Sequence, residues 1–508
     1  MIWFHVEKKS LRATIQLPMA EKTALMECFQ LISINESATV ADAAVAAAAM
    51  DIARSAVEFA EQTSVPATSA LSFSAVAGPI SEEQRDGSYV MSLQSQRYQL
   101  LQSLLEAAWI GDWTADEQWI RSTLRPLAAI FNSHIFPLTL PFEQTAAPAY
   151  YRPLVNALIL YLRYVREISQ GNKKDSMALE LDDFLQSVVP VLAQLLSDVI
   201  TMVQSEPNPS ALGDLDLTVS ALSGLMSHRS AGLLCLAHLD QKGLILRSCE
   251  MIPRNSLAIP GLLKSITRLH WTIAQIPEGA EKLSVQGVLR AYTGTPLLQN
   301  LSVHPESLNV DSELHSIWTT MLSVSRSLLQ TLPYTAEYIA TEILPFVNSM
   351  HRRIQSALAW QLEANSLLVQ LAEIHSILEM LLHIARDVEV DIALSKHLFQ
   401  RYSKSVLSYL LSATNALTRP TVIRMKVMHT FGLDTEDMDE KPAGVAAAID
   451  AAGDCVMQAL LVTSSSAVSL LAEWLSISNA FSRHSATSSV HQIRLPSVSP
   501  GAMWRWID

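Results

Sequence analysis

Apolar residues recur along this chain at intervals of three and four, the spacing that places them on one face of an α-helix. Segment Glu363–Arg386 shows the pattern in a stripe made of Leu367, Leu371, Ile374, Leu378, Leu381 and Ala385. Similar stripes predict helices over Ser176–Gln204 and Tyr334–Trp360, where Pro190 and Pro345 are each expected to kink or interrupt the helix. Alternating strand patterns are nearly absent, so we expect an all-α protein.

The same period predicts further helices over Ala20–Ser33, Thr39–Gln62, Ser92–Trp109, Asp116–Ser133, Ala149–Ser169, Ala211–Met226, Ser256–Gln275, Asp311–Thr331, Asp391–Ala416 and Gly444–Ala480. Segments that lack it are expected to be loops, namely Thr63–Val90, Ser205–Asp214, Tyr292–Val310 and Gly432–Lys441. Helices joined by short connections indicate antiparallel pairs, and no exact repeat is visible. The expected fold is therefore an irregular HEAT/armadillo-like α-solenoid of antiparallel helix pairs.

The pattern divides the chain into three regions. Residues 1–91 hold N-terminal helices, one of them rich in alanine, and a flexible loop over 63–90. Residues 92–481 are expected to form one continuous α-helical solenoid, because single cores stop growing at about 250–300 residues. Residues 482–508 are rich in serine and lack periodicity, so they are expected to form a loosely ordered tail.

Composition sharpens this picture. Hydrophobic residues make up 49% and charged residues 17% of the chain, so a large apolar area must be buried. The formal net charge of −13 repels phosphate backbones, and no direct contact with nucleic acid is expected. The stretch closest to a membrane span is Cys455–Ala472, which has no charge but contains polar groups such as Gln458. Because such groups cost several kcal/mol in hydrocarbon, we expect a buried helix there and no transmembrane segment.

The sequence shows no catalytic motif. Phosphate-binding loops, dinucleotide fingerprints, zinc-protease helices and serine-hydrolase elbows are all missing, so neither an enzyme nor a cofactor is expected. His375, Glu379 and His383 are spaced to form one ridge of a helix, but no fourth ligand accompanies them and we predict no metal site. Cys235 and His238 do not have zinc-finger spacing, and Cys235 is interpreted as a buried small hydrophobe.

Charge patterning gives the one candidate binding site. Segment Ile392–Leu433 contains no Asp or Glu, and the acidic run Asp434–Glu440 follows it directly. One interpretation is a solvated face neutralised by that acidic run. The other is a docking surface for an acidic partner, with membrane headgroups or RNA as less favoured ligands. If consecutive antiparallel helices bring them together, the residues of this partner-binding patch are Arg401, Lys404, Arg424 and Lys426.

Several stretches also resemble a known family. They are PAYYRP (148–153) running into LVNALILYLRYV, then Leu314–Pro333, Thr335–Leu358 and the leucine-rich Glu363–Arg386. Together they look like the C-terminal region of the giant scaffold nucleoporins of the inner ring of the nuclear pore. The nucleoporin-188 class is nearest and the nucleoporin-192/205 class second. Members of this family are much longer, so the chain is expected to be a C-terminal part of such a protein or the product of a truncated gene model.

The resemblance implies an α-solenoid at the nuclear envelope, within the nuclear pore complex, that binds neighbouring nucleoporins and supports nucleocytoplasmic transport. It implies no FG-repeat domain, and no functional residues carry over from it. The alternative is a HEAT-type transport receptor or cargo adaptor. Such receptors usually carry long acidic inner loops, and only Asp434–Glu440 resembles one here. A helical enzyme is disfavoured because no convergent polar cluster is visible.

Overall fold

The computed structural model describes residues 152, 155–156, 158–162, 177–205, 207–254, 259–305, 312–332, 338–362, 367–386, 392–430 and 443–485. Within these residues 91% are helical and none lies in a strand. The prediction of an all-α protein is therefore confirmed for this portion of the chain. The predicted N-terminal region (residues 1–91), the helices expected before residue 149 and nearly all of the tail 482–508 lie outside the described residues.

The first of the described helices are α7 (Met177–Ser205), α8 (Pro209–Met226), α9 (Arg229–Gln241), α10 (Leu244–Arg254), α11 (Pro260–Ala274) and α12 (Pro277–Val285). Helices α8, α11 and α12 begin with a proline, whose missing N–H is not needed in the first turn. At α8 the side chain of Asn208 accepts a hydrogen bond from the backbone N–H of Ala211 at 2.8 Å. An N-cap followed by proline thus fixes where this helix starts.

The chain continues through α13 (Val288–Thr293), α14 (Pro296–Val303), α15 (Glu313–Thr331), the π-helical turn η4 (Ile339–Ile343), α17 (Leu344–Ser349), α18 (His351–Leu358), α19 (Leu367–Arg386), α20 (Ile392–Leu417), α21 (Pro420–Thr430) and α22 (Ala443–Ser485). The hydroxyl of Thr295 caps α14 by accepting from Leu298 N, and Ser312 caps α15 by accepting from His315 N, both at 3.2 Å. Side-chain caps therefore set two further helix starts.

The two proline predictions have different outcomes. The segment around Pro345 is split into η4, α17 and α18, with a break at Met350, as expected. Pro190 lies inside α7, which continues unbroken, so the expected interruption there is wrong. Pro190 is exposed, whereas Val188, Val189 and Leu192 beside it are buried. The helix therefore continues on its packed face, while the hydrogen bond that Pro190 cannot donate is missing on the solvent side.

Two predicted loops are also partly wrong. Most of Tyr292–Val310 is occupied by the end of α13 and by α14, and α8 begins inside Ser205–Asp214. Helices α13 and α14 contain 6 and 8 residues. Such short helices cannot show two full repeats of an apolar stripe, so periodicity does not reveal them.

Helices α8, α11, α15, α19 and α22 lie side by side in one row. Their cross-links are Ser223–Thr272 (2.9 Å), Lys264–Glu313 (3.4 Å), Gln330–His383 (3.1 Å) and Ser466–Glu379 (2.6 Å). Between α15 and α19, His315 contacts Glu373 and the later Gln330 contacts the later His383. Because contact positions advance together on both helices, the neighbours α15 and α19 are parallel.

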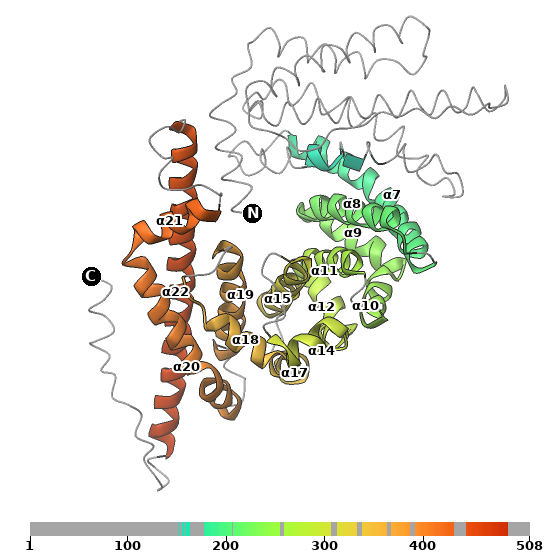
Figure 1. The fold of residues 1–508 in the computed structure, drawn as a ribbon. Coiled ribbons are helices and arrows are strands. Elements are labelled where there is room, and N and C mark those ends of the chain that lie inside the picture. The colour runs from blue at the N-terminus through green and yellow to red at the C-terminus, as the bar shows by residue number, and fades with distance from the viewer. Residues whose placement is uncertain are drawn as a thin grey trace, which may run out of the picture.

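A second row runs beside the first and contains α7, α9–α10, α12–α13, η4–α17–α18 and α20. Its cross-links are Lys242–Gln194 (2.5 Å), Arg247–Gln204 (2.9 Å), Lys282–Asp240 (2.6 Å), Arg290–Glu342 (2.5 Å) and Arg401–Asn348 (2.6 Å). Figure 1 shows both rows following one curved path from α7 and α8 to α20 and α22.

Helix α22 closes this path and runs antiparallel to α20. Phe399 near the start of α20 contacts Trp474 late in α22, with ring centroids 5.7 Å apart, and Tyr409 hydrogen-bonds to Thr463. Farther along, Arg424 of α21 lies against Asp450 at 3.4 Å. As the residue number rises from α20 to α21, the number of the contacted residue in α22 falls. Helices α20 and α21 therefore lie end to end against α22 (Figure 1).

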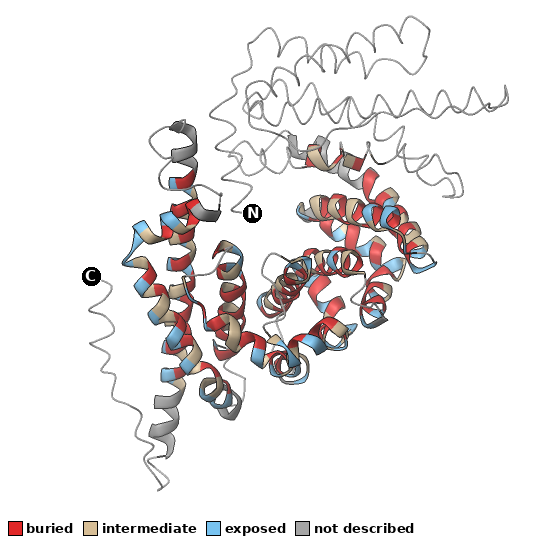
Figure 2. Ribbon diagram, viewed as in Figure 1, coloured by how far each residue is buried: buried red, intermediate tan, exposed pale blue. Residues whose placement is uncertain are grey.

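Buried apolar residues form one connected core between the rows, as Figure 2 shows by the inward-facing buried positions. In the part of the chain that the structure describes, three helical stretches are long and apolar enough to cross a membrane by length and composition, namely Val188–Ser205, Leu367–Arg386 and Ile449–Ile477. Of these windows 50%, 61% and 39% are buried inside the fold. The last one includes Cys455–Ala472, so the expected absence of a transmembrane segment stays a prediction.

Candidate functional site

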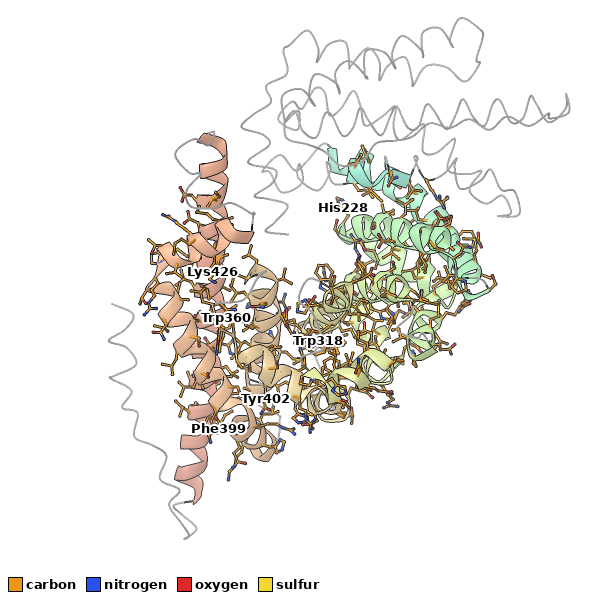
Figure 3. The ribbon with its side chains drawn as sticks, in the orientation of Figure 1. His228, Trp318, Trp360, Phe399, Tyr402 and Lys426 are labelled. Carbon is orange, nitrogen blue, oxygen red and sulfur yellow. The ribbon has the colours of Figure 1, made fainter. Side chains whose placement is uncertain are left out.

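The four cations predicted to bind a partner lie in two separate groups. Arg401 and Lys404 belong to α20, whereas Arg424 and Lys426 belong to α21. Because both helices pack end to end along α22, the two groups are about 25 Å apart along its axis at 1.5 Å per residue. Figure 3 shows Tyr402, the neighbour of Arg401 in the chain, well away from Lys426. The expectation that antiparallel neighbours would unite the four is therefore wrong, since α20 and α21 do not fold back on each other.

The α21 group is neutralised within the chain. Arg424 Nε lies 3.4 Å from Asp450 Oδ1, and its Nη2 lies 3.8 Å from Asp454 Oδ1. The side chain rests on α22 at Gly453, where an added Cβ would lie 3.0 Å from Arg424 Cγ. These contacts agree with the interpretation of a solvated, internally balanced face for this group. The balancing acids are on α22, and the acidic run 434–440 lies outside the described residues.

The α20 group has no such balance. Arg401 Nη1 donates to Asn348 Oδ1 at 2.6 Å, and the carbonyl of Arg401 accepts from Gln355 Nε2 at 3.2 Å. Exposed Arg352 lies between Asn348 and Gln355 at the start of α18, and exposed Lys404 is one turn after Arg401. In the described portion of the chain, no ion pair involves these three cations. We name Arg352, Arg401 and Lys404 the α18–α20 face.

Sequence reasoning did not find Arg352. Arg352 and Arg401 are far apart in the sequence and come together only because α18 stacks on α20. Arg352 also lies outside the acid-free segment 392–433 on which the predicted patch was based. The only signal was its place in the cationic run His351–Arg353. Arg353, its neighbour, is buried and points the other way. From the sequence alone, two adjacent arginines do not show which one is exposed and can bind a partner.

The residues weighed as a metal site face different helices. Glu379 Oε1 accepts from Ser466 Oγ of α22 at 2.6 Å, while His383 Nε2 accepts from Gln330 Nε2 of α15 at 3.1 Å. Burial lowers the pKa of His375 and of His383, and the nearby Glu379 opposes that shift. Among the residues that the structure describes, no group of three or more metal-ligating side chains is arranged to hold an ion.

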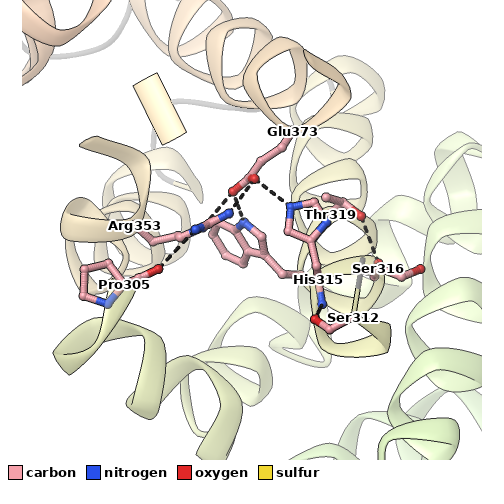
Figure 4. A network of polar contacts seen from close by, with 8 residues as sticks. Pro305, Ser312, His315, Ser316, Thr319, Arg353 and Glu373 are labelled. Atoms are coloured by element: carbon pink, nitrogen blue, oxygen red, sulfur yellow. Dashed lines mark hydrogen bonds and ion pairs between the residues drawn. The ribbon is translucent and has the colours of Figure 1, made fainter. Parts of the chain in front are cut away.

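A buried carboxylate at the centre of the fold was not predicted, since Glu373 was placed off the apolar stripe. Glu373 Oε1 accepts from Trp318 Nε1 at 2.6 Å and from Arg353 Nε at 2.9 Å, and Oε2 accepts from His315 Nε2 and Arg353 Nη2, both at 2.7 Å (Figure 4). Arg353 Nη1 also donates to the carbonyl of Pro305 at 3.1 Å. Burial raises the pKa of Glu373, but the His315 hydrogen bond and the Arg353 charge outweigh it and hold that pKa below its ordinary value. The network joins α15, α18 and α19.

A second buried cluster has the composition of a catalytic pair but not its access. His270 Nε2 lies 2.8 Å from Ser248 Oγ, and its Nδ1 lies 3.1 Å from Tyr292 Oη. All three side chains are fully buried, and burial lowers the pKa of His270 to about 3. Cys249, next to Ser248, is buried, and burial raises the pKa of its thiol to about 12. Because these side chains are buried, a substrate could not contact them in this conformation. The hydrogen bonds of the cluster instead connect α10, α11 and α13.

Cys235, which was singled out from the sequence, is buried and free, and so is Cys249. Burial also raises the pKa of Cys235 to about 12, so its interpretation as a small hydrophobe is confirmed.

In comparisons with known proteins, no family model and no relative matches this chain. A function must therefore be argued from the arrangement of helices and from the α18–α20 face.

Proposed function

We propose that this chain is a non-catalytic structural scaffold and that its helix pairs form an irregular HEAT-like α-solenoid. One observation carries the proposal, namely the recurring spacing of the contacts between neighbouring helices. Hydrogen-bonded side chains that join neighbouring helices within each row lie 42 to 58 residues apart in the sequence from α7 through α20. HEAT and armadillo repeats contain about 40–47 residues, so spacings in this region are typical of stacked helix pairs.

The same arrangement supports binding over chemistry. In a stacked array each pair contacts mainly its neighbours, so the chain presents long outer surfaces and few enclosed clefts. The polar clusters around Glu373 and His270 are buried, and their hydrogen bonds connect neighbouring helices. They fix the stacking of helices, whereas the α18–α20 face is exposed and offers charge to another molecule.

Within this class we propose a structural component of the nuclear pore complex at the nuclear envelope, which binds neighbouring nucleoporins and supports nucleocytoplasmic transport. The support is the resemblance of Leu314–Pro333 and Thr335–Leu358 to the inner-ring scaffold nucleoporins. Those stretches correspond to α15 and to η4, α17 and α18. They include His315, Trp318 and Arg353, which surround Glu373.

A HEAT-type transport receptor or cargo adaptor is the second candidate. One feature of the sequence favours it, the acidic run Asp434–Glu440 between α21 and α22. A receptor of this kind would use that run to contact basic cargo or a small GTPase.

Small-angle scattering of the purified full chain tests the solenoid. A compact globule of this length has a radius of gyration of roughly 23 Å, and we expect a clearly larger value. A measured value equal to that of a compact globule would contradict the stacked array.

Proximity labelling with the full chain in cells, followed by mass spectrometry, tests the function. Enrichment of pore components supports the scaffold, and enrichment of a small GTPase with cargo supports the receptor. A labelling profile no different from that of an unfused labelling enzyme would refute both.

A further inference from the structure

We propose that the α18–α20 face binds an acidic amphipathic helix of a partner protein. The proposal rests on the scaffold function proposed above and names where one partner docks and by what chemistry. Its cationic component is Arg352, Arg401 and Lys404. Its apolar component is Leu407 and Leu411 of α20, which are 48% and 60% exposed.

The cations are concentrated in a region without acids. Helices α17, α18 and α20 contain no Asp or Glu. Asn348 at the end of α17 and Gln355 of α18 both contact Arg401, and Arg352 lies between them in the sequence at the start of α18. Stacking of helices from different regions of the chain thus adds a third cation to the α20 pair.

The acids nearest to this level already have partners. Glu373 is buried against Arg353, Glu379 accepts from Ser466, and Glu473 lies 3.3 Å from Arg386. The acidic residues in segment 387–391 precede α20 in the sequence, and Arg401 lies about 15 Å further along the helix at 1.5 Å per residue. Acids that precede a helix favour the positive end of its dipole.

The acidic run 434–440 cannot neutralise this face. It belongs to the connection between Thr430 and Ala443, which are at the far end of α21 and α22. A connection of that length, even fully extended, reaches about 20 Å from its anchors. The level of Lys404 lies about 40 Å from Ala443 along α22. The run is therefore too far along α22 to neutralise the α18–α20 face, and no acid among the described residues pairs with that face.

The apolar residues define the shape of that partner. Lys404, Leu407 and Leu411 are spaced i, i+3 and i+7, so they form one straight ridge on the solvent side of α20. In the described rows, helices pack side by side along such ridges. A partner helix laid along α20 covers the leucines with its apolar stripe and places acidic side chains opposite the cations. An amphipathic helix brings an apolar stripe beside its charges, which RNA lacks, so the exposed leucines favour a protein partner.

The test uses the purified full chain and a synthetic probe. The probe is a fluorescent helical peptide of Leu, Ala and Glu, with one leucine stripe flanked by glutamates. Its control replaces every Glu by Lys. Binding is measured by fluorescence anisotropy for the wild type, for the triple variant Arg352→Gln/Arg401→Gln/Lys404→Gln and for Leu407→Ser/Leu411→Ser. The matched control is Arg424→Gln/Lys426→Gln, which removes cations from the internally balanced group.

We expect the triple variant to bind the acidic peptide about tenfold more weakly, with a similar loss for the leucine variant and less than about twofold for the control. Affinity should fall as salt rises. All variants should keep the wild-type circular dichroism spectrum. Absence of peptide binding by the wild type, or equal weakening by the control variant, overturns the proposal. Tighter binding to phosphatidylserine vesicles or to single-stranded RNA than to the peptide overturns it as well.

Proximity labelling with the triple variant separates this proposal from the scaffold function. If the wild type enriches partners and the triple variant loses some of them, both stand. If the variant keeps every partner, the docking face is wrong while the scaffold function survives. If the wild type enriches none, the scaffold function itself fails.

Discussion

Arg353 and Glu373 form a two-point hydrogen-bonded ion pair in the core, with Nε 2.9 Å from Oε1 and Nη2 2.7 Å from Oε2. The exposed fractions of the two side chains are 8% and 2%. Two charges removed from water this far are tolerated only when they pair closely and gain further hydrogen bonds. Trp318 and His315 donate to Glu373, and the carbonyl of Pro305 accepts from Arg353, whereas His315 Nδ1 is buried without a hydrogen-bond partner.

Replacing Glu373 by Gln should therefore be severe. The variant Glu373→Gln leaves the Arg353 charge buried without a counter-charge, and we expect a loss of about 3–5 kcal/mol in the free energy of unfolding. Urea denaturation followed by circular dichroism measures it. The control is Glu379→Gln on the same helix, whose amide oxygen can still accept from Ser466 without the charge and which should cost no more than about 1.5 kcal/mol. Equal losses in the two variants would contradict the special role of the pair.

His270 should make stability depend on pH. Burial lowers its pKa to about 3 from an ordinary 6.5, so between these values the unfolded chain binds a proton that the folded chain excludes. Stability from this group is complete above pH 6.5 and falls as pH decreases below it. At about 1.4 kcal/mol per pH unit, the wild type should lose up to about 2 kcal/mol between pH 6.5 and pH 5.

The comparison that isolates this effect is His270→Gln. This variant should be less stable at neutral pH but should lose less on acidification, as measured by urea denaturation at pH 7 and pH 5. That window lies above the range in which Glu373, with its lowered pKa, takes up a proton. An identical slope with pH in the variant and the wild type would exclude His270 as the source.

Two glycines should respond in opposite directions to alanine. An added Cβ at Gly279 would overlap the carbonyl oxygen of Ile273 and lie 2.8 Å from its Cγ2, whereas one at Gly213 would meet nothing within 4 Å. Gly279→Ala forces α12 away from the end of α11 and should cost about 1–3 kcal/mol. Gly213→Ala, inside α8, should add about 0.5–1 kcal/mol. Thermal melts of the two variants check both signs, and a gain in melting temperature for Gly279→Ala would show that α12 shifts freely.

The sequence predicted long helices well and their arrangement poorly. In α19 the stripe from Leu367 to Ala385 is buried as expected, because a long amphipathic helix reports its packed face through its period. Helices α13 and α14 are too short to do so. Pro190 was expected to interrupt α7, but the helix continues through it because packing on its buried side dominates there.

Only part of the candidate site could be predicted from the sequence. The absence of acids around Arg401 and Lys404 is a local property and could be read directly. The position of Arg352 near Arg401, and the ion pair of Arg424 with Asp450, both depend on which helices stack against each other. No local pattern encodes a contact between residues about fifty positions apart.

Two of the three stretches apolar enough to span a bilayer, α19 and α22, are joined by Ser466–Glu379 and Arg386–Glu473 contacts. To insert α19 in a bilayer, Glu373 would have to leave the arginine, histidine and tryptophan that satisfy it, at a cost of about 2.5–3.5 kcal/mol for each charge near the centre. We therefore expect the full chain to be released from cell membranes by alkaline carbonate. A version with an appended, established membrane helix serves as the retained control. Retention of the unmodified chain in the carbonate pellet, with release only by detergent, would show that one of these helices crosses the membrane.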